Sequence, residues 1–196
     1  MAAGMPKGRG ARPMNAAAFV VGPQDGAAAS LMTLAQGAGL EPVLPYRSLA
    51  KAEAQLLQTP LVFFLCAAVS NIQDLKPMAD AIRFSPSLKL RFSPMIYFAR
   101  SPSAQDIRAC INMGFDDVIA LPFGATQLAG RIARQVGVPQ VYYETSTYFG
   151  PDRRNRLESD SSDPRRGKGG HFRRIEIQRN PATGIEELSD ELQVVV

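Results

Sequence analysis

Five short apolar runs alternate with five segments of helical periodicity between residues 16 and 137 of this 196-residue chain. Each run has the length of a buried strand, and Gly, Pro or Asp residues mark the turns between many of the runs and the helical segments. The sequence predicts strands over 16–21, 40–46, 62–65, 95–99 and 117–121, and helices over 26–38, 49–58, 71–86, 103–114 and 125–137. This alternation predicts an α/β fold, a doubly wound parallel sheet of five strands with helices on both faces. Ligand sites in such sheets lie at the carboxyl ends of the strands.

The regions on either side of this central domain, residues 16–137, differ from it in composition. Residues 1–15 are basic and rich in Gly and Pro, which predicts a disordered leader. Residues 150–180 hold nine Lys and Arg against five Asp and Glu. We therefore expect 138–196 to be a basic, largely flexible C-terminal extension, with a possible β-hairpin at 171–196, where two alternating stretches flank NPATG.

Composition also excludes several kinds of site. The chain has one histidine and two cysteines without a Cys-x-x-Cys pair, so neither a multi-histidine metal site nor a disulfide framework is expected. The glycine-rich motifs that bind nucleotide phosphates do not occur. The sequence contains no apolar run of transmembrane length and no signal-peptide core, which predicts a cytosolic protein that does not bind membranes. We expect no metal and no cofactor.

The stretch GFDDVIALPF, from Gly114 to Phe123, coincides with the last predicted strand. Together with the order of the elements, it resembles the receiver domain of two-component response regulators, which has a Gly-Ala-Asp-Asp-Tyr-hydrophobic-x-Lys-Pro-Phe pattern at this place. The matching residues are Gly114, Asp116, Asp117, Pro122 and Phe123. The resemblance covers residues 16–137. It implies a flavodoxin-like receiver fold and a role in phosphorelay signal transduction.

Five positions depart from what this resemblance implies for a phosphorylation site. The family's phosphorylated aspartate corresponds to Cys66, its magnesium-binding acidic pair to Gly22 and Pro23, its Thr or Ser to Ala99, and its Lys to Leu121. Magnesium requires oxygen ligands, and a phosphoryl group requires a cation, and none of these five side chains offers either. The chain therefore resembles a pseudo-receiver, which implies a protein that is not an enzyme and that binds its partners without phosphorylation.

Cys66 itself has two interpretations. The favoured one is a small buried apolar residue at the end of a strand. The other is a redox-sensing thiol, which requires a nearby cation or helix N-terminus to lower its pKa, and Leu121 removes the obvious cation. Asp25 is the one carboxylate near this pocket, and we interpret it as a helix cap rather than a metal ligand.

The stretch YFGPDRRNR, from Tyr148 to Arg156, resembles a segment of short receiver-like regulators of alphaproteobacteria. Its Pro-Asp pair favours a turn. Tyr148 and Phe149 are expected to anchor this turn, so that three arginines project outward to an acidic partner or to nucleic acid. These arginines are Arg153, Arg154 and Arg156. A solvated basic linker is the alternative interpretation.

Two hypotheses about function follow. The first is a phosphorylation-independent protein-interaction module in bacterial signalling, with homodimerisation considered through the face of the fourth helix, fifth strand and fifth helix. Arg108, Ile119 and Arg131 are expected on that face. The alternative is a nucleic-acid- or ribosome-associated factor that binds through its basic extension, where RRGKGGHFRR, residues 165–174, would contact phosphates.

Overall fold

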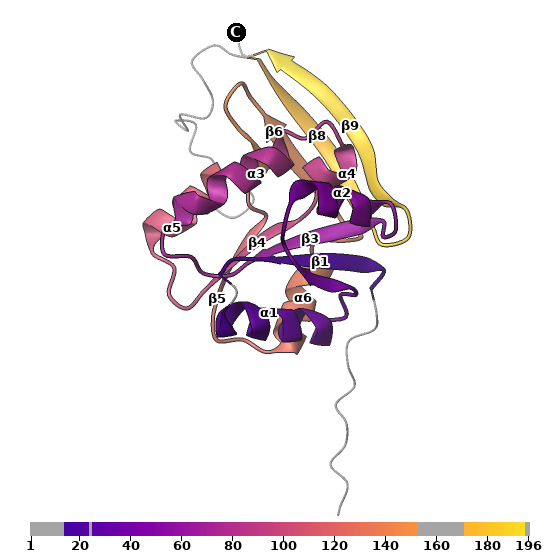
Figure 1. The fold of residues 1–196 in the computed structure, drawn as a ribbon. Coiled ribbons are helices and arrows are strands. Elements are labelled where there is room, and N and C mark those ends of the chain that lie inside the picture. Colours follow the sequence, from indigo (N-terminus) through magenta and orange to yellow (C-terminus); the bar gives the residue numbers. More distant parts are fainter. Residues whose placement is uncertain (1–13, 24, 153–170, 195–196) are drawn as a thin grey trace, which may run out of the picture.

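A computed structural model describes residues 14–23, 25–152 and 171–194 of the chain (Figure 1). Its first part is a parallel five-stranded sheet with the strand order β2-β1-β3-β4-β5. The strands are β1 (Ala16–Val21), β2 (Val43–Pro45), β3 (Leu61–Cys66), β4 (Met95–Ala99) and β5 (Asp117–Ala120). This is the flavodoxin-like order of a doubly wound sheet, so the predicted fold class is confirmed.

Helices cover both faces of the parallel sheet (Figure 1). On one face, α1 (Gly26–Gly37) and α6 (Ala125–Ala133) pack against β1, β3, β4 and β5. The opposite face is covered by α2 (Leu49–Leu56), α3 (Lys76–Arg83) and α5 (Ala104–Asn112), together with the 3-10 turn η1 (Ile72–Leu75) and the short α4 (Leu88–Arg91). The single helix expected over 71–86 is thus divided into η1 and α3. It ends before Pro86, because the residue that precedes a proline disfavours helical geometry.

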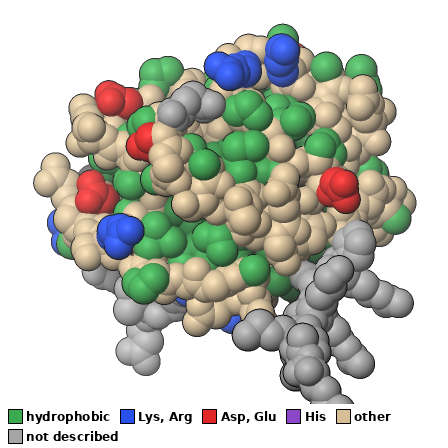
Figure 2. Space-filling model, turned by 60° about the horizontal axis from the view of Figure 1, so that its bottom comes forward, with side chains coloured by type: hydrophobic (Ala, Val, Ile, Leu, Met, Phe, Trp, Pro, Cys, Tyr) green, Lys and Arg blue, Asp and Glu red, His purple; other side chains and the backbone are tan. Residues whose placement is uncertain are grey.

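The inner strands are apolar along their whole length because both of their faces are covered. All six residues of β1 and all six of β3 are buried. Strand β2 lies at the edge of the sheet, as its prolines suggested. No helix in the described part of the chain is long and apolar enough to cross a membrane. Helix α1 contains no charged residue, and uncharged side chains predominate on the face that α1 and α6 cover (Figure 2).

The chain after Gly137 forms a second sheet, with the strand order β7-β6-β8-β9. These antiparallel strands are β6 (Pro139–Glu144), β7 (Phe149–Pro151), β8 (His171–Asn180) and β9 (Gly184–Val194). Strands β8 and β9 pair over the range in which a hairpin was expected. The structure differs from the expectation of a largely flexible extension for residues 139–152 and 171–194, because their alternating apolar residues find a surface to cover. Residues 1–13 and 153–170, including most of the expected leader, lie outside the described residues.

The antiparallel sheet covers the amino edge of the parallel sheet, where β4 and β5 begin. Phe92, which precedes β4, forms a buried cluster with two aromatic and two aliphatic residues of the second sheet. These residues are Tyr142, Phe149, Ile175 and Ile177. The ring of Phe92 lies 5.0 Å from that of Tyr142 and 5.4 Å from that of Phe149, between ring centres. The two sheets therefore share a hydrophobic interface, which leaves the carboxyl edge of the parallel sheet on the opposite side.

Candidate functional site

The five positions expected to form the altered phosphorylation pocket meet at the carboxyl edge of the parallel sheet. Val21, directly before Gly22, is in register with Cys66, which in turn is in register with Tyr97 of β4. The backbone N–H of Leu121 donates to the carbonyl oxygen of Ala99 at 2.8 Å. The fold thus places the ends of β1, β3, β4 and β5 side by side, in the arrangement that the resemblance implied.

The end of β1 disfavours any side chain at Gly22. This glycine has a φ of 139°, a backbone conformation that residues with side chains rarely adopt. A β-carbon at this position would lie 3.1 Å from the β-carbon of Ala67, at the end of β3. The backbone and the packing of the neighbouring strand thus both oppose a magnesium-binding side chain there.

The five residues of the pocket differ in exposure, and none of them is a carboxylate. Pro23 is exposed, Gly22 and Leu121 are half-buried, and Cys66 and Ala99 are buried. Among the described residues, no group of three or more His, Cys, Asp and Glu could hold a metal ion. Asp25 caps α1, accepting hydrogen bonds from the backbone N–H groups of Ala27 and Ala28 at 2.9 and 3.2 Å. Its interpretation as a helix cap is confirmed.

Cys66 is enclosed in the apolar core. Its side chain is fully buried in the cluster beneath α3 and α5. This burial raises the pKa of the thiol, so the reactive thiolate is suppressed. The environment favours the interpretation as a small apolar residue over that of a redox sensor.

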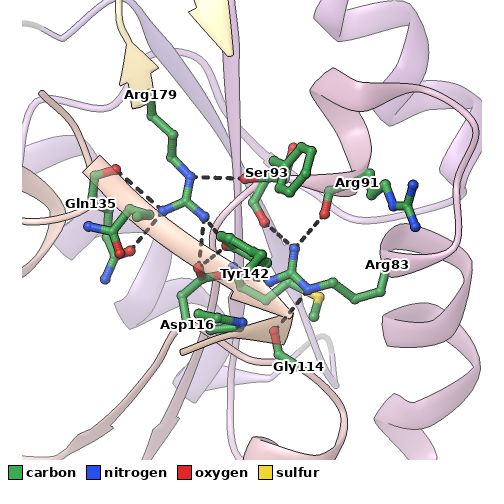
Figure 3. Close-up of polar contacts among 12 residues, drawn as sticks. Arg83, Arg91, Ser93, Gly114, Asp116, Gln135, Tyr142 and Arg179 are labelled. Carbon is green, nitrogen blue, oxygen red and sulfur yellow. Dashed lines mark hydrogen bonds and ion pairs between the residues drawn. The ribbon is translucent and has the colours of Figure 1, made fainter. Parts of the chain in front are cut away.

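The sequence analysis missed the most distinctive polar site, a buried cluster at the amino edge of the parallel sheet (Figure 3). We call it the junction cluster: Arg83, Asp116, Gln135, Tyr142 and Arg179. The side chains of Arg83, Arg179 and Asp116 are 1, 0 and 2% exposed. Two guanidinium groups and one carboxylate are thus withdrawn from water at the contact between the two sheets.

Asp116 lies at the centre of the junction cluster, one residue before β5. Its Oδ2 accepts from Nη2 of Arg83 at 2.6 Å and from the backbone N–H of Met95 at 2.8 Å. Its Oδ1 accepts from Nη2 of Arg179 at 2.7 Å and from the hydroxyl of Tyr142. Both carboxylate oxygens therefore have two donors each, Oδ2 from the first domain and Oδ1 from the second sheet.

The N–H groups of Arg83 that do not bind Asp116 are directed to the backbone. Arg83 ends α3, and its Nε donates to the carbonyl oxygen of Gly114 at 2.8 Å. Its Nη1 donates to the carbonyl oxygens of Arg91 and Ser93 at 2.7 and 2.9 Å. The side chain thus fixes the segment between α4 and β4 to the loop before β5.

Arg179 has the corresponding role from strand β8. Its Nε donates to the carbonyl oxygen of Phe92 at 2.9 Å, and its Nη1 donates to the side-chain oxygen of Gln135 at 2.9 Å. Its Nη2 donates to the hydroxyl of Tyr142 as well as to Asp116. Since β8 belongs to the second sheet and Phe92 and Gln135 to the first domain, Arg179 holds the two parts together.

The two arginines determine the charge state of Asp116. Burial alone would raise the pKa of its carboxyl group, but the guanidinium groups of Arg179 and Arg83 lower it to about 2. Burial raises the pKa of the Tyr142 phenol, which keeps this hydroxyl protonated as a donor. Asp116 is thus ionised at neutral pH and compensates half of the buried positive charge.

The YFGPDRRNR stretch contributes to the same interface. Phe149 is buried, and the guanidinium group of Arg91 lies 4.2 Å from the centre of its ring. A β-carbon on Gly150 would lie 2.8 Å from the Cα of Gly114, so this glycine allows β7 to contact the loop before β5 directly. Tyr148 is half-buried, and its hydroxyl donates to the carbonyl oxygen of Pro151 at 3.4 Å. The expected outward-pointing Arg153, Arg154 and Arg156 lie outside the described residues.

The expected dimerisation face is formed by α5, β5 and α6. Arg108 is exposed on α5, and Arg131 on α6 pairs with Asp117 at 3.1 Å. Ile119 was expected on this surface but is 5% exposed, because it packs into the core under α1 and α6. This residue cannot contribute to an interface there.

Comparison with known proteins gives structural neighbours only. No model of a known protein family matches the chain, and no curated protein matches it. A CheY-like protein, TadZ, from Pseudomonas aeruginosa is similar, with 20% identity, 61% of this chain and 98% of that chain covered, and a TM-score of 0.48. A protein from Chloroflexus aurantiacus described as a response regulator has 21% identity, 63 and 98% coverage, and the same TM-score. An atypical orphan response regulator, described as having a phosphorylation-independent regulatory mechanism, has 13% identity, 60 and 92% coverage, and a TM-score of 0.40.

These neighbours are receiver domains and response regulators, the family that the sequence resembles. At these identities the similarity concerns the fold alone. The strand order of the parallel sheet establishes that fold independently.

Proposed function

We propose that this chain is a non-enzymatic, phosphorylation-independent protein-interaction module in bacterial signal transduction. The observation that carries the proposal is the environment of Cys66. At the place where a receiver exposes its phosphorylated aspartate, this chain has a fully buried side chain in an apolar cluster. A group in this position cannot attack a phosphodonor in solution.

The surroundings of Cys66 support the same conclusion. Phosphoryl transfer to a carboxylate needs magnesium and a compensating cation. Gly22 and Pro23 supply no oxygen ligand, Leu121 supplies no cation, and packing against Ala67 opposes a side chain at Gly22. A single substitution would not restore the site, because each of the required groups is missing.

The second sheet supports a role in binding. Arg179 and Tyr142 fix it to the parallel sheet through Asp116, so the described parts of the chain offer one rigid surface without a phosphorylation switch. Partner binding is then constitutive, or controlled by the amount of protein. A homodimer through the face of α5, β5 and α6, and a cytosolic location, stay predictions.

The alternative, binding of nucleic acid through the basic extension, is less well supported by the described residues. Arg173 pairs with Asp190 and Glu144, Arg174 pairs with Glu176, and Arg179 is buried. The arginines of β8 are therefore already neutralised, and any contact with phosphates would have to come from residues 153–170, outside the described part.

The proposal is tested by incubating the full chain with magnesium and acetyl phosphate and measuring its intact mass. An ordinary receiver domain treated in parallel is the positive control, and the Cys66→Asp variant tests whether the acceptor alone is missing. We expect no phosphoryl adduct on the native chain or on Cys66→Asp. A stoichiometric phosphoryl adduct on the native chain, whether acid-stable or an acyl phosphate, would refute the proposal.

A further inference from the structure

The two sheets have four edge strands, and only one of them is long. Strands β2 and β7 have three residues each and contain a proline, and β5 has four residues. Short strands and prolines are common means of preventing an edge from pairing with another chain. Strand β9 has 11 residues and no proline, and its pairing with β8 is interrupted by one β-bulge, at Leu188.

The outer side of β9 is available for pairing. Its inner side pairs with β8 from Gly184 to Val194, and no element among the described residues pairs with its outer side (Figure 1). The beginning of β9 lies against the first domain, since Gly184 approaches the carbonyl oxygen of Pro60 and Ile185 packs on the core. From Glu186 onward, about every second residue directs its backbone N–H and C=O away from β8.

The side chains of β9 add a chemical preference to this edge. Leu188 and Leu192 are 49 and 66% exposed, which is unusual for large apolar residues of a strand. The strand also carries four acidic residues and no basic one: Glu186, Glu187, Asp190 and Glu191. Asp190 pairs with Arg173, and Glu186 accepts hydrogen bonds from Asn180 and Thr183.

Glu187 and Glu191 are the other two acidic residues of β9, and both are exposed. Glu191 is in register with Arg174, which also pairs with Glu176, whereas Glu187 is in register with the apolar Ile177. Among the described residues, the edge thus combines unpaired backbone groups, two exposed leucines and a surplus of acidic side chains within eight residues of one strand, from Glu186 to Gln193.

We propose that the outer edge of β9 binds an extended, cationic segment of a partner protein by strand addition. Backbone hydrogen bonds would supply affinity, and basic side chains next to Glu187 on one face of the sheet and Glu191 on the other would supply specificity. This deepens the proposed function and rests on it for the claim that the partner is a protein.

Charge distinguishes this occupant from two others. A second copy of the chain pairing β9 with β9 would bring eight carboxylates together without a basic side chain from either strand, and like charges opposite one another destabilise a sheet. Nucleic acid would present phosphates to the same carboxylates. An extended cationic peptide is the occupant that complements both the backbone and the charge.

The test uses the full chain and a fluorescent heptapeptide of lysine pairs and valine pairs, which presents lysine on both faces of the sheet, with the corresponding glutamate–valine peptide as the matched probe. Anisotropy measures affinity, and backbone hydrogen exchange locates the binding. We expect the lysine peptide to bind with a salt-dependent affinity and to slow exchange of the β9 amides that face away from β8, between Glu186 and Gln193. The glutamate peptide should not bind.

Charge reversal in β9 gives a result that a loss of folding cannot produce. In Glu187→Lys/Glu191→Lys, affinity for the lysine peptide should fall about tenfold or more, and the glutamate peptide should now bind, a gain that a misfolded protein would not show. The control Glu53→Lys/Asp74→Lys changes the net charge equally on the exposed surface of α2 and η1 and should alter affinity less than about threefold.

Four results would overturn the proposal. They are no binding of the lysine peptide, equal loss in the control variant, exchange protection outside β9, and protection of the outward-facing amides of β9 in the protein without peptide. The last would mean that the edge is already occupied, by a second copy if the protection depends on concentration and by the same chain if it does not. None of these results concerns the carboxyl edge, so they are distinct from a failure of the phosphorylation-independence proposal.

Discussion

The carboxyl edge and the amino edge of the parallel sheet differ in the charged side chains that they carry. At the carboxyl edge, where receivers hold their reactive carboxylates, the strand ends carry Gly22, Cys66, Ala99 and Leu121. At the amino edge, two arginines and Asp116 are buried together under the second sheet. At the carboxyl edge, these strand ends lack the charged groups that phosphorylation requires. The amino edge, by contrast, encloses charged groups that water cannot reach.

The comparison shows that one motif can keep the fold while its residues do something else. Asp116 belongs to the GFDD motif that resembles receivers, yet its carboxylate is committed to Arg83, Arg179, Tyr142 and the backbone of Met95. A buried ion cluster stabilises a protein only while each charge has its partners. The amino edge is therefore the structurally sensitive end, and the carboxyl edge should tolerate change.

The largest effect is expected for Asp116→Ala. Removing this carboxylate leaves two buried guanidinium groups without a counter-charge, and we expect the free energy of unfolding to fall by about 3–5 kcal/mol. The neighbouring Asp117→Ala removes a carboxylate whose partner, Arg131, is 36% exposed, and should cost about 1 kcal/mol. Urea denaturation followed by circular dichroism measures both values. Equal losses of unfolding free energy in the two variants would show that the buried charges of the junction cluster are no more sensitive than a partly exposed ion pair.

A smaller loss is expected for Arg179→Met. Here Arg83 and Asp116 remain as a neutral pair, and the methionine fills part of the space, so we expect a loss of about 1–3 kcal/mol. Arg174→Met, which removes a partly exposed ion pair with Glu176 from the same strand, is the matched control and should cost less than about 1 kcal/mol. If Arg179→Met costs as much as Asp116→Ala, the charge imbalance is not what makes Asp116 sensitive.

Acid should weaken the junction cluster. The pKa of Asp116 is lowered to about 2 in the folded protein, below the ordinary value of 3.8 for an aspartate, so its ionisation stabilises the fold above about pH 4. This contribution, about 2 kcal/mol, is lost as the pH falls from about 4 through 2. We expect the stability of Asp116→Asn, measured by urea denaturation over this range, to depend less on pH than that of the native chain. Identical pH profiles would contradict the assignment.

The smallest effect is expected at the carboxyl edge. Cys66→Ala removes one buried sulfur atom, and we expect it to cost about 1 kcal/mol. In a Cys110→Ala background, the Cys66 thiol should resist iodoacetamide in the folded protein and react after urea unfolding, because burial both shields it and raises its pKa. Rapid alkylation of the folded protein would restore the redox interpretation.

The sequence predicted the parallel sheet well because strands and helix ends produce patterns among residues that are close in sequence. Buried strands produce apolar runs, and helix ends produce caps such as Asp25, Ser48 and Ser103, each of which accepts a backbone hydrogen bond in the structure. The altered pocket was also predictable, since the carboxyl ends of parallel strands must meet at one edge.

The junction cluster depends on contacts distant in sequence, and the prediction missed it for that reason. Arg83 and Arg179 lie 33 and 63 residues from Asp116. A signal was nevertheless present. Arg179 continues the alternation of Ile175 and Ile177, and Arg83 lies four residues after the buried Ala79. Each arginine occupies a position where the pattern calls for an apolar residue, and an arginine on a buried face requires an acidic partner.

The most direct test of the account is a titration of the isotopically labelled full chain with magnesium and beryllofluoride, which mimics a phosphoryl group, followed by NMR. The account predicts no saturable shift of the backbone amides of Gly22, Cys66, Ala99 and Leu121, because the carboxyl edge offers no ligand and no reachable acceptor. A saturable shift confined to these residues would show that the pocket still binds a phosphoryl group, and would contradict the central claim.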